Sequence, residues 1–296
     1  PVCVPVYYVS KLARDNGVIV VQVGEGSDEL FCGYRDYTRQ MMLGPYYKAF
    51  AALPRLARSP IAALGKRLLR PSRALYLERG AQGAPLFWGG VDGLPESTKE
   101  AILNGLGSDD AAIAWLKGHY RARNAAGGKG SLLDEMIYLE LKHRLPELLL
   151  MRVDKMTMAN SVEARVPFLD HEFVRFALSV PPSLKFKNGQ TKYILKTAAR
   201  GVLPDWVIDR AKAGFCGSAS NMVRGPIVDA AERLVRNNQG LRELMDWQPL
   251  LDLCQRNRDG DLSTGYHIWM LLTLAVWHSM WIQGVEPDRI SHWLKA

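Results

Sequence analysis

One stretch decides the fold: Val18-Ile-Val-Val-Gln-Val-Gly24-Glu25-Gly26-Ser27-Asp28-Glu29-Leu-Phe-Cys-Gly33-Tyr34. Residues 18–23 are apolar except for Gln22, which predicts a parallel strand covered on both faces. Gly24 and Gly26 allow a tight turn or the close approach of a ligand. In open α/β sheets ligands bind just beyond the carboxyl ends of strands, so this turn is a candidate site.

Three carboxylates follow the strand within five positions, at Glu25, Asp28 and Glu29. Ser27 is predicted to cap a helix that runs to about residue 37, with the last two acids in its first turn. An ordinary strand-to-helix turn would show the same pattern, because acids complement the helix dipole. The alternative is functional: crowded carboxylates need a lysine or a metal, and such oxygens suit Mg²⁺ beside phosphates.

The composition describes a globular chain of 296 residues, 48% hydrophobic, which suffices for one large domain or two ordinary ones. The net charge is +8, and the span from Thr38 to Leu77 contains eight basic residues and no acid. The rest of the chain is therefore about neutral. This local basicity excludes a nucleic-acid-binding protein with positive charge spread over its surface.

The basic segment 38–77 is interrupted by Pro45, Pro54, Pro60 and Pro71, which predicts short helices. Its apolar and basic residues do not sort into one sustained face in the linear sequence. We therefore expect a solvated, variable insertion and no membrane contact. Contact with an anionic surface or partner is the alternative.

The four cysteines form no Cys-x-x-Cys pair, and no histidine cluster has zinc spacing. Free thiols in a reducing cytoplasm are the simplest interpretation, and no signal peptide opens the chain. The apolar stretch 266–285 contains polar residues and has Trp269, Leu272, Val276 and Met280 at helical spacing. It predicts a buried C-terminal helix and not a membrane span.

Further helices are expected at residues 5–16, 96–104, 109–120, 131–145 and 147–160, with Ser131 as an N-cap and Pro146 restarting the chain. Residues 80–93 and 121–130 read as loops. No second convincing strand is visible, so the partner strands of the sheet are expected from sequence outside this chain. We divide the chain into a closing αβα piece (1–37), a variable helical insertion (38–130) and a helical part with substrate and phosphate loops (131–296).

Two further motifs carry charge. In residues 148–170 the Arg152, Asp154 and Lys155 side chains are expected to pair with one another, as are Glu163 and Arg165. The loop ends at Asp170, which is expected to cap the next helix.

The last motif, Asp209-Arg-Ala-Lys212-Ala-Gly214-Phe215, places a lysine before a glycine-flanked aromatic residue. A lysine in a water-poor cleft suits phosphate, although most lysines are simply solvated. Upstream, Gly189-Gln-Thr-Lys192-Tyr-Ile-Leu-Lys196 opens a helix with two lysines four residues apart.

Taken in order, the motifs Gly-Glu-Gly-Ser-Asp-Glu-Leu-Phe-x-Gly-Tyr, Val-Glu-Ala-Arg-Val-Pro-Phe-Leu-Asp, Gly-x-x-Lys-x-x-Leu-Lys and Arg-x-Lys-x-Gly-Phe resemble the synthetase domain of glutamine-dependent asparagine synthetases. The resemblance extends from about Pro5 to Trp281, with residues 38–130 poorly matched. It implies an α/β fold of the nucleotide α-hydrolase type, with a PP-loop ATP pyrophosphatase sheet. The remainder is expected to be predominantly helical, which makes this chain mostly α.

The resemblance implies a ligase, an amidotransferase that uses ATP and Mg²⁺. ATP adenylates a carboxylate, usually that of aspartate, and ammonia released from glutamine by a separate N-terminal domain then attacks. The products are asparagine, AMP and pyrophosphate. The implied partners are a small carboxylate substrate, an upstream glutaminase domain and a second copy of the chain.

The resemblance also assigns roles to residues. Glu25 matches the proton acceptor near the attacking nitrogen, and Lys212 the lysine that stabilises the charged transition state. Asp28 matches the position on the Mg²⁺–pyrophosphate. The implied nucleotide-binding residues are Gly24, Gly26, Ser27, Arg165 and Lys192.

This chain departs from the family pattern in several places. Val23 stands where the family usually has Ser or Thr, and Cys32 where it has Gly. The pyrophosphate loop Ser-Gly-Gly-x-Asp-Ser and the glutaminase domain are absent from this sequence. We therefore expect the chain not to form an acyl-adenylate by itself.

Two alternatives remain open. A family relative could act on another carboxylate, such as a sugar acid or a peptide, or close an intramolecular amide as in β-lactam synthetases. A non-catalytic relic could retain the fold alone, although the presence of Glu25, Asp28 and Lys212 argues against decay of the site.

Overall fold

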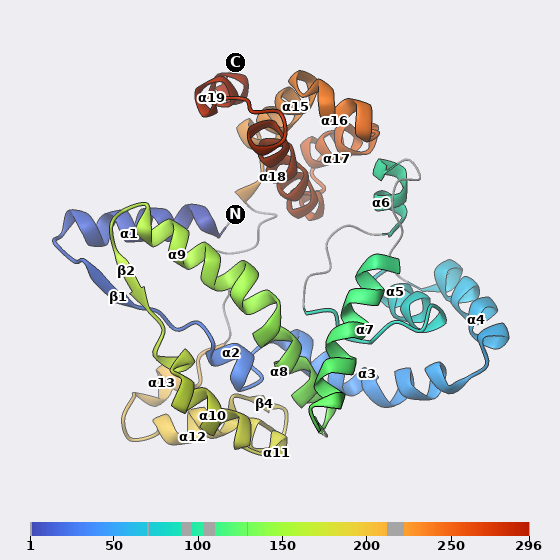
Figure 1. Cartoon of the computed structure of the whole chain (residues 1–296), viewed down its shortest axis with the longest axis vertical. Coiled ribbons are helices and arrows are strands. Elements are labelled where there is room, and N and C mark those ends of the chain that lie inside the picture. The colour runs from blue at the N-terminus through green and yellow to red at the C-terminus, as the bar shows by residue number, and fades with distance from the viewer. Residues whose placement is uncertain are drawn as a thin grey trace. The chain divides into compact units, whose positions relative to one another are not determined.

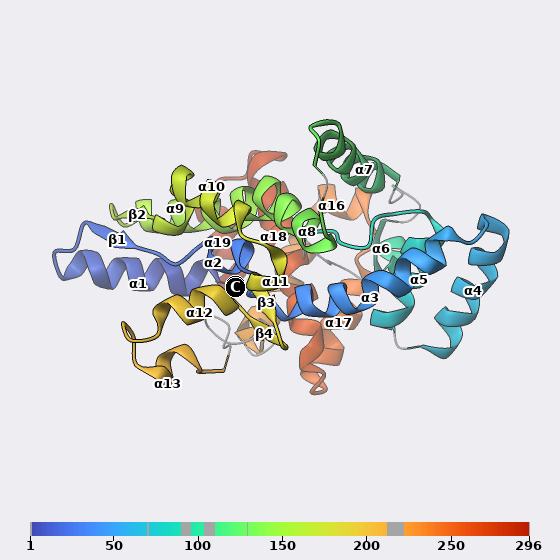
Figure 2. The same ribbon diagram turned by 90° about the horizontal axis from the view of Figure 1, so that it is seen from below.

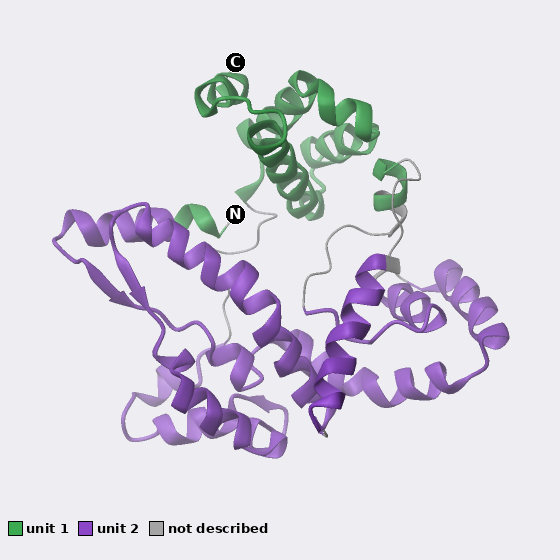
Figure 3. Ribbon diagram, viewed as in Figure 1, with its two compact units in different colours: residues 1–5, 92–108, 212–296 green, residues 6–91, 109–211 purple. Residues whose placement is uncertain are grey.

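The computed structural model describes residues 2–69, 71–89, 96–103, 110–128, 130–211 and 222–295. They divide into two compact units (Figure 3): one of residues 1–5, 92–108 and 212–296, the other of residues 6–91 and 109–211. The predicted functional boundaries after residues 37 and 130 stay predictions. We call the two units the C-terminal unit and the central unit and describe each by itself.

The chain opens with α1 (Cys3–Asp15), β1 (Val20–Gln22) and α2 (Ser27–Leu30), as Figure 1 shows. β1 pairs in parallel with β2 (Glu163–Arg165), with Val21 opposite Ala164. The expectation that every partner strand lies outside this chain is therefore wrong. β2 escaped prediction because it has three residues, two of them charged, and so lacks an apolar run.

The expectation that the first strand is covered on both faces is also wrong in this chain. Val18, Ile19 and Val20 are exposed, Ile19 with 58% of its surface. Within the described residues β1 has β2 as its one neighbour, so little of the strand is shielded from solvent.

The basic segment forms helices, as predicted: α3 (Arg35–Ala52), α4 (Arg55–Leu68) and α5 (Pro71–Ala81). Pro45 and Pro60 lie inside α3 and α4 and do not end them. The single helix predicted from Ser27 to about residue 37 is instead α2 and α3. Cys32 separates them, because its φ of 60° is incompatible with a right-handed helix.

The core of the central unit lies around α8 (Leu132–Lys142), with α7 (Asp110–Ala125) beside it. Ser131 and Asp134 form the predicted N-terminal cap of α8, a reciprocal capping box. Residues beyond α8 form a π-helix, η1 (Leu145–Leu150), and then α9 (Met151–Met158). Buried side chains on α8 pack with two aromatic rings, in a cluster that includes Leu133, Met136, Ile137, Leu139, Tyr37 and Phe87.

The central unit ends in short elements: the 3₁₀ turn η2 (Pro167–Leu169), α10 (His171–Ser179), α11 (Pro182–Lys185), β3 (Phe186–Lys187), β4 (Gln190–Thr191), α12 (Tyr193–Ala199) and α13 (Asp205–Ile208). Asp170 caps α10 as predicted, accepting hydrogen bonds from the backbone N–H groups of Glu172 and Phe173. β3 and β4 form an antiparallel hairpin. Its turn residues, Asn188 and Gly189, both have positive φ, as a tight hairpin requires.

The C-terminal unit contains α6 (Glu96–Leu103), α15 (Pro226–Asn237), α16 (Gln239–Leu244), α17 (Gln248–Arg258), the 3₁₀ turn η3 (Leu262–Thr264), α18 (Gly265–Trp281) and α19 (Pro287–Lys295). The buried helix predicted at residues 266–285 is α18, which contributes Ile268, Leu271 and Ala275 to the core. None of the helices in the described residues is both long and apolar enough to cross a membrane.

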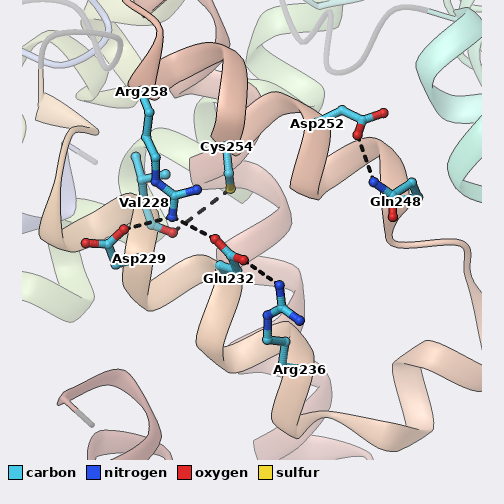
Figure 4. A network of polar contacts seen from close by, with 8 residues as sticks. All are labelled: Val228, Asp229, Glu232, Arg236, Gln248, Asp252, Cys254 and Arg258. Atoms are coloured by element: carbon cyan, nitrogen blue, oxygen red, sulfur yellow. Dashed lines mark hydrogen bonds and ion pairs between the residues drawn. The ribbon is translucent and has the colours of Figure 1, made fainter.

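An ion-pair network joins α15 to α17 (Figure 4). Arg258 donates to Asp229 at 2.8 Å and to Glu232 at 2.7 Å, and Glu232 also accepts from Arg236 at 2.6 Å. Beside the network, Cys254 is buried and forms no disulfide. Cys32 is likewise a buried free thiol, and Cys3 is a free thiol that is half-buried. This agrees with the free thiols predicted, and Cys216 lies outside the described residues.

Candidate active site

The candidate site begins at the turn after β1. The chain leaves the strand through Val23, whose N–H donates to the carbonyl oxygen of Arg165 at 2.9 Å. Gly24 is exposed, and a Cβ placed on it meets no atom within 4 Å, so space remains beside its backbone. Gly26 has a φ of 93°, and a Cβ there would overlap Leu169. Glycine is therefore required at position 26 by both conformation and space.

Ser27 does not cap α2, contrary to the prediction. Gly26 occupies the N-cap position and Ser27 is the first helical residue. Because Ser27 is already inside the helix, its hydroxyl is free for a tertiary contact, and it accepts a hydrogen bond from Lys192 Nζ at 3.0 Å.

Lys192 also forms an ion pair with Asp28, with 2.8 Å between Nζ and Oδ1. The two side chains keep only 21% and 18% of their surface exposed. The Lys192 backbone has a φ of 54°, and its N–H donates to the Phe31 carbonyl at 3.0 Å. The structure therefore brings together three predicted site residues and supplies the lysine that the crowded carboxylates require.

Gly33 also belongs to the site, although the sequence motif alone predicts no role for it. A Cβ at this position would overlap both the Asp28 carboxylate and the Lys192 stem. Only glycine leaves room for this ion pair. The sequence carries no local signal for this role, because the overlap depends on where the Asp28 and Lys192 side chains lie.

Glu29 is almost fully buried and accepts a hydrogen bond from the Tyr34 hydroxyl at 2.6 Å. Burial, and then the charge of Glu29, raises the pKa of Tyr34, so the phenol stays protonated as the donor. The guanidinium of Arg144 lies over the Tyr34 ring, 4.5 Å from its centroid. Arg144 is thus linked to the acidic turn through Tyr34.

Arg144 is in turn held by Glu140, with 2.8 Å between Nη1 and Oε2. Glu140 is fully buried, and burial raises its pKa to about 7 although Arg144 acts in the opposite direction. Sequence reasoning missed this pair. Its signal was present in the sequence, because Glu140 and Arg144 are four residues apart, a spacing at which opposite charges meet on one side of a helix.

Glu25 is half-buried, and its pKa is raised first by burial and then by the charge of Glu29. Arg152 and Arg144 lower it again. A carboxylate with a raised pKa binds a proton more readily near neutral pH, which suits a proton acceptor. The arrangement is therefore able to take up a proton at Glu25.

The π-helix explains why both arginines act on the same carboxylate. Arg144 and Arg152 are eight residues apart, about 2.2 turns of an α-helix. A π-helix holds more residues per turn, because its hydrogen bonds span five residues. η1 lies between the two arginines and reduces their rotation towards two whole turns, which brings them towards one face.

Other predicted residues lie apart from this cluster. Arg165 pairs with Glu163 at 2.9 Å, as predicted, but both side chains are exposed and only the Arg165 backbone reaches the turn. Asp154 and Lys155 are exposed, and in the described part of the chain neither pairs with Arg152, which contradicts the predicted pairing. Lys212 lies outside the described residues.

The described residues contain no group of three or more His, Cys, Asp or Glu that would hold a metal ion alone. Mg²⁺, however, is commonly bound by one or two carboxylates together with substrate phosphates. Asp28, the residue predicted to contact the metal, fits that mode because it lies on the turn where the phosphates are expected.

The chain is similar to proteins of one family. The profile described as "Asparagine synthase" matches residues 1–279. Asparagine synthetase [glutamine-hydrolyzing] 1 of Bacillus subtilis is 30% identical over 99% of this chain and 45% of its own length. A putative asparagine synthetase [glutamine-hydrolyzing] of Mycobacterium bovis is 30% identical over 98% and 44%. A protein named amidase chyE of Penicillium rubens is 25% identical over 81% and 38%.

The chain thus spans somewhat less than half the length of these relatives. No solved structure matches it. The mostly helical architecture with one parallel strand pair agrees with the fold that the sequence predicts. Since the profile covers residues 1–279, the chain belongs to the asparagine synthase family and has its PP-loop ATP pyrophosphatase fold.

Proposed function

We propose that this protein activates a carboxylate with ATP and transfers it to ammonia, giving an amide, AMP and pyrophosphate. The observation that carries the proposal is the contact of Lys192 with both Ser27 and Asp28, on the turn that follows a parallel strand. Such turns are the usual ligand sites of open α/β sheets. The family and its relatives named asparagine synthetase support the same reaction type.

In this proposal the turn binds the nucleotide. Lys192 supplies positive charge to the phosphates, and the Ser27 hydroxyl is held ready by that lysine. Gly24 and Gly26 let the backbone approach the nucleotide. For Arg165 to contribute its guanidinium to the nucleotide, its exposed side chain would have to leave Glu163. Asp28 would hold Mg²⁺ together with the phosphates, and the metal would neutralise part of their charge.

Glu25 is proposed as the proton acceptor. When ammonia attacks the activated carboxylate, the nitrogen becomes cationic and must lose a proton. Glu25 accepts it, and the raised pKa of this carboxyl favours proton uptake. Lys212 is proposed to stabilise the negative charge that develops on the departing groups.

Aspartate is the proposed substrate, with glutamine as the source of ammonia through a glutaminase domain, and the cytoplasm as the location. A second candidate is amidation of a different carboxylate. Two observations favour it: Val23 replaces the usual hydroxyl residue, and one relative carries the name amidase. A relic without catalysis would leave Glu25 and the Lys192 contacts without a role.

The test uses the protein encoded by the complete reading frame, with ATP, Mg²⁺, ammonium and a panel of carboxylic acids. We expect pyrophosphate and AMP to form in equal amounts with one acid, together with its amide. Release of ADP and phosphate would overturn adenylation, and no turnover with any acid, combined with no ATP binding, would indicate the relic. Glu25→Gln should stop amide formation, whereas Lys11→Ala on exposed α1 should not.

A further inference from the structure

Helix α4 turns large aliphatic side chains towards solvent. Leu56 is 91% exposed, Leu68 73%, Leu64 57% and Ile61 41%. Positions 61, 64 and 68 repeat at helical spacing, and position 56 lies on the adjoining flank. We call these four residues the outer face of α4.

The side of α4 that packs against α5 carries small residues. Ala62 and Gly65 are its buried positions, and a Cβ on Gly65 would overlap Leu77 of α5. A helix that serves only its own core places large apolar residues inward. α4 does the reverse: close packing against α5 uses small residues, and the larger apolar area remains outside. Figures 1 and 2 both draw α4 at the outer edge of the central unit.

The exposed charges of α4 and α5 are of one sign. Arg55, Lys66 and Arg67 of α4 and Arg73 of α5 are exposed, and residues 38–77 contain no acid. By helical rotation Arg67 lies beside Leu56, whereas Arg55 and Lys66 lie on the side of α4 away from Ile61, Leu64 and Leu68. Among the described residues Lys66 pairs with Glu78 at 3.8 Å, and this lysine is 61% exposed. These cations are therefore available to an anionic partner.

We propose that the outer face of α4 binds the surface of a lipid bilayer that contains anionic lipids. The aliphatic side chains enter the boundary between head groups and acyl chains, and Arg67 beside Leu56 extends its stem to the phosphates. The other cations of α4 add to the attraction for an anionic surface. A second copy of this chain would bring the same acid-free surface against itself, so like charges would oppose that contact. Lipid head groups provide both complements, negative charge and an apolar layer.

The linear sequence predicts a solvated segment without membrane contact. In the linear sequence Ala62, Ala63 and Gly65 alternate with the large residues and conceal the outer face. The separation becomes visible only when exposure divides small buried residues from large exposed ones.

The test is sedimentation of the complete protein with vesicles of phosphatidylcholine, with or without about one third phosphatidylglycerol. We expect binding to the anionic vesicles, several-fold weaker binding to the neutral ones, and release as salt screens the charges. Equal sedimentation with and without vesicles would overturn the proposal.

Two combined variants divide the contributions. Leu56→Ser with Leu64→Ser and Leu68→Ser should weaken binding at least about tenfold. Arg55→Gln with Lys66→Gln and Arg67→Gln should remove the preference for anionic lipid. The matched control replaces three scattered exposed aliphatic residues: Leu178→Ser, Val202→Ser and Leu244→Ser.

The control variant should bind as the wild type does. If it loses binding equally, the outer face of α4 is not the lipid site. Light scattering provides a separate check: an oligomer that dissociates only in the α4 leucine variant, without vesicle binding by the wild type, would assign the face to a second copy and overturn the proposal.

Discussion

Lys192 Nζ lies 2.8 Å from Asp28 Oδ1, and this ion pair joins the turn after β1 to the start of α12. Two segments far apart in the sequence thereby form one charged site. The lysine backbone is in the left-handed region, with a φ of 54°, which an ordinary residue adopts only when its surroundings hold it there. The hydrogen bond from the Lys192 N–H to the Phe31 carbonyl helps to hold this backbone conformation.

Replacing Lys192 by alanine should weaken both stability and ATP binding. Asp28 would lose its cation in a largely buried place, which we expect to cost about 1–3 kcal/mol of unfolding free energy. Lys11→Ala is the matched control, because Lys11 and Asp15 are also 2.8 Å apart but mostly exposed, so no measurable change is expected. Chemical denaturation and nucleotide titration would measure the effects, and equal behaviour of the two variants would contradict this account.

Gly33→Ala tests the same ion pair without removing a charge. The added methyl would overlap both Asp28 and Lys192 and force them apart, at about 1–3 kcal/mol. Gly118→Ala is the control, since a Cβ on that helical glycine meets nothing within 4 Å. We expect Gly118→Ala to be neutral or stabilising by up to about 1 kcal/mol. Destabilisation of both to the same degree would show that space at position 33 is not the cause.

Sequence reasoning located the turn but not its partners. The apolar run and the glycines at 24 and 26 predict a strand and a ligand-binding turn, because those signals are local. β2 was missed since Ala164 is its one apolar residue. The cap assigned to Ser27 was wrong because Gly26 takes the left-handed N-cap position first.

The charged residues around the site show the same limit. Lys192 was assigned from a motif, but its contact with Asp28 depends on how α12 packs, which no spacing encodes. Arg144 is linked to the turn because it stacks on Tyr34, and an ion pair with Glu140 holds its guanidinium. The stacking on Tyr34 arises from tertiary packing, which no local pattern encodes, whereas the bond to Glu140 has the four-residue spacing of a helical ion pair.

Lys212→Ala tests a residue whose proposed role rests on the sequence alone, because Lys212 lies outside the described residues. We expect turnover to be lost while ATP still binds, because the proposed role is in the transition state and not in nucleotide affinity. Nucleotide titration and pyrophosphate release, measured on the same preparation, separate the two effects. Near-normal turnover would remove Lys212 from its role.

Arg144→Met should move the pH dependence of catalysis. Arg144 lowers the pKa of Glu25, so its loss raises that pKa further. If ionised Glu25 accepts the proton, the acid limb of kcat/KM shifts to higher pH while the rate at the plateau is largely kept. Arg144→Lys retains the charge and should leave the limb near its wild-type position.

The control for this prediction is Arg236→Met. Arg236 forms a similar pair with a glutamate four residues earlier, in the other unit. It should leave the acid limb unchanged. An acid limb that stays in place in Arg144→Met would show that Arg144 does not act on the catalytic carboxylate.

Glu140 should make stability depend on pH in the direction opposite to an ordinary salt-bridged acid. Burial raises its pKa from the usual 4.5 to about 7, so ionisation is harder in the folded state than in the unfolded one. Its contribution to stability is present below about pH 4.5 and is lost as the pH rises to about 7. Relative to Glu140→Gln, the wild type should therefore lose unfolding free energy over this range.

Glu232→Gln is the control: arginine hydrogen bonds lower the pKa of Glu232, so its contribution is lost only at more acid pH and stays flat from about 5 to 8. Urea denaturation across that range measures both, and a wild-type advantage over Glu140→Gln that grows with pH would contradict the raised pKa.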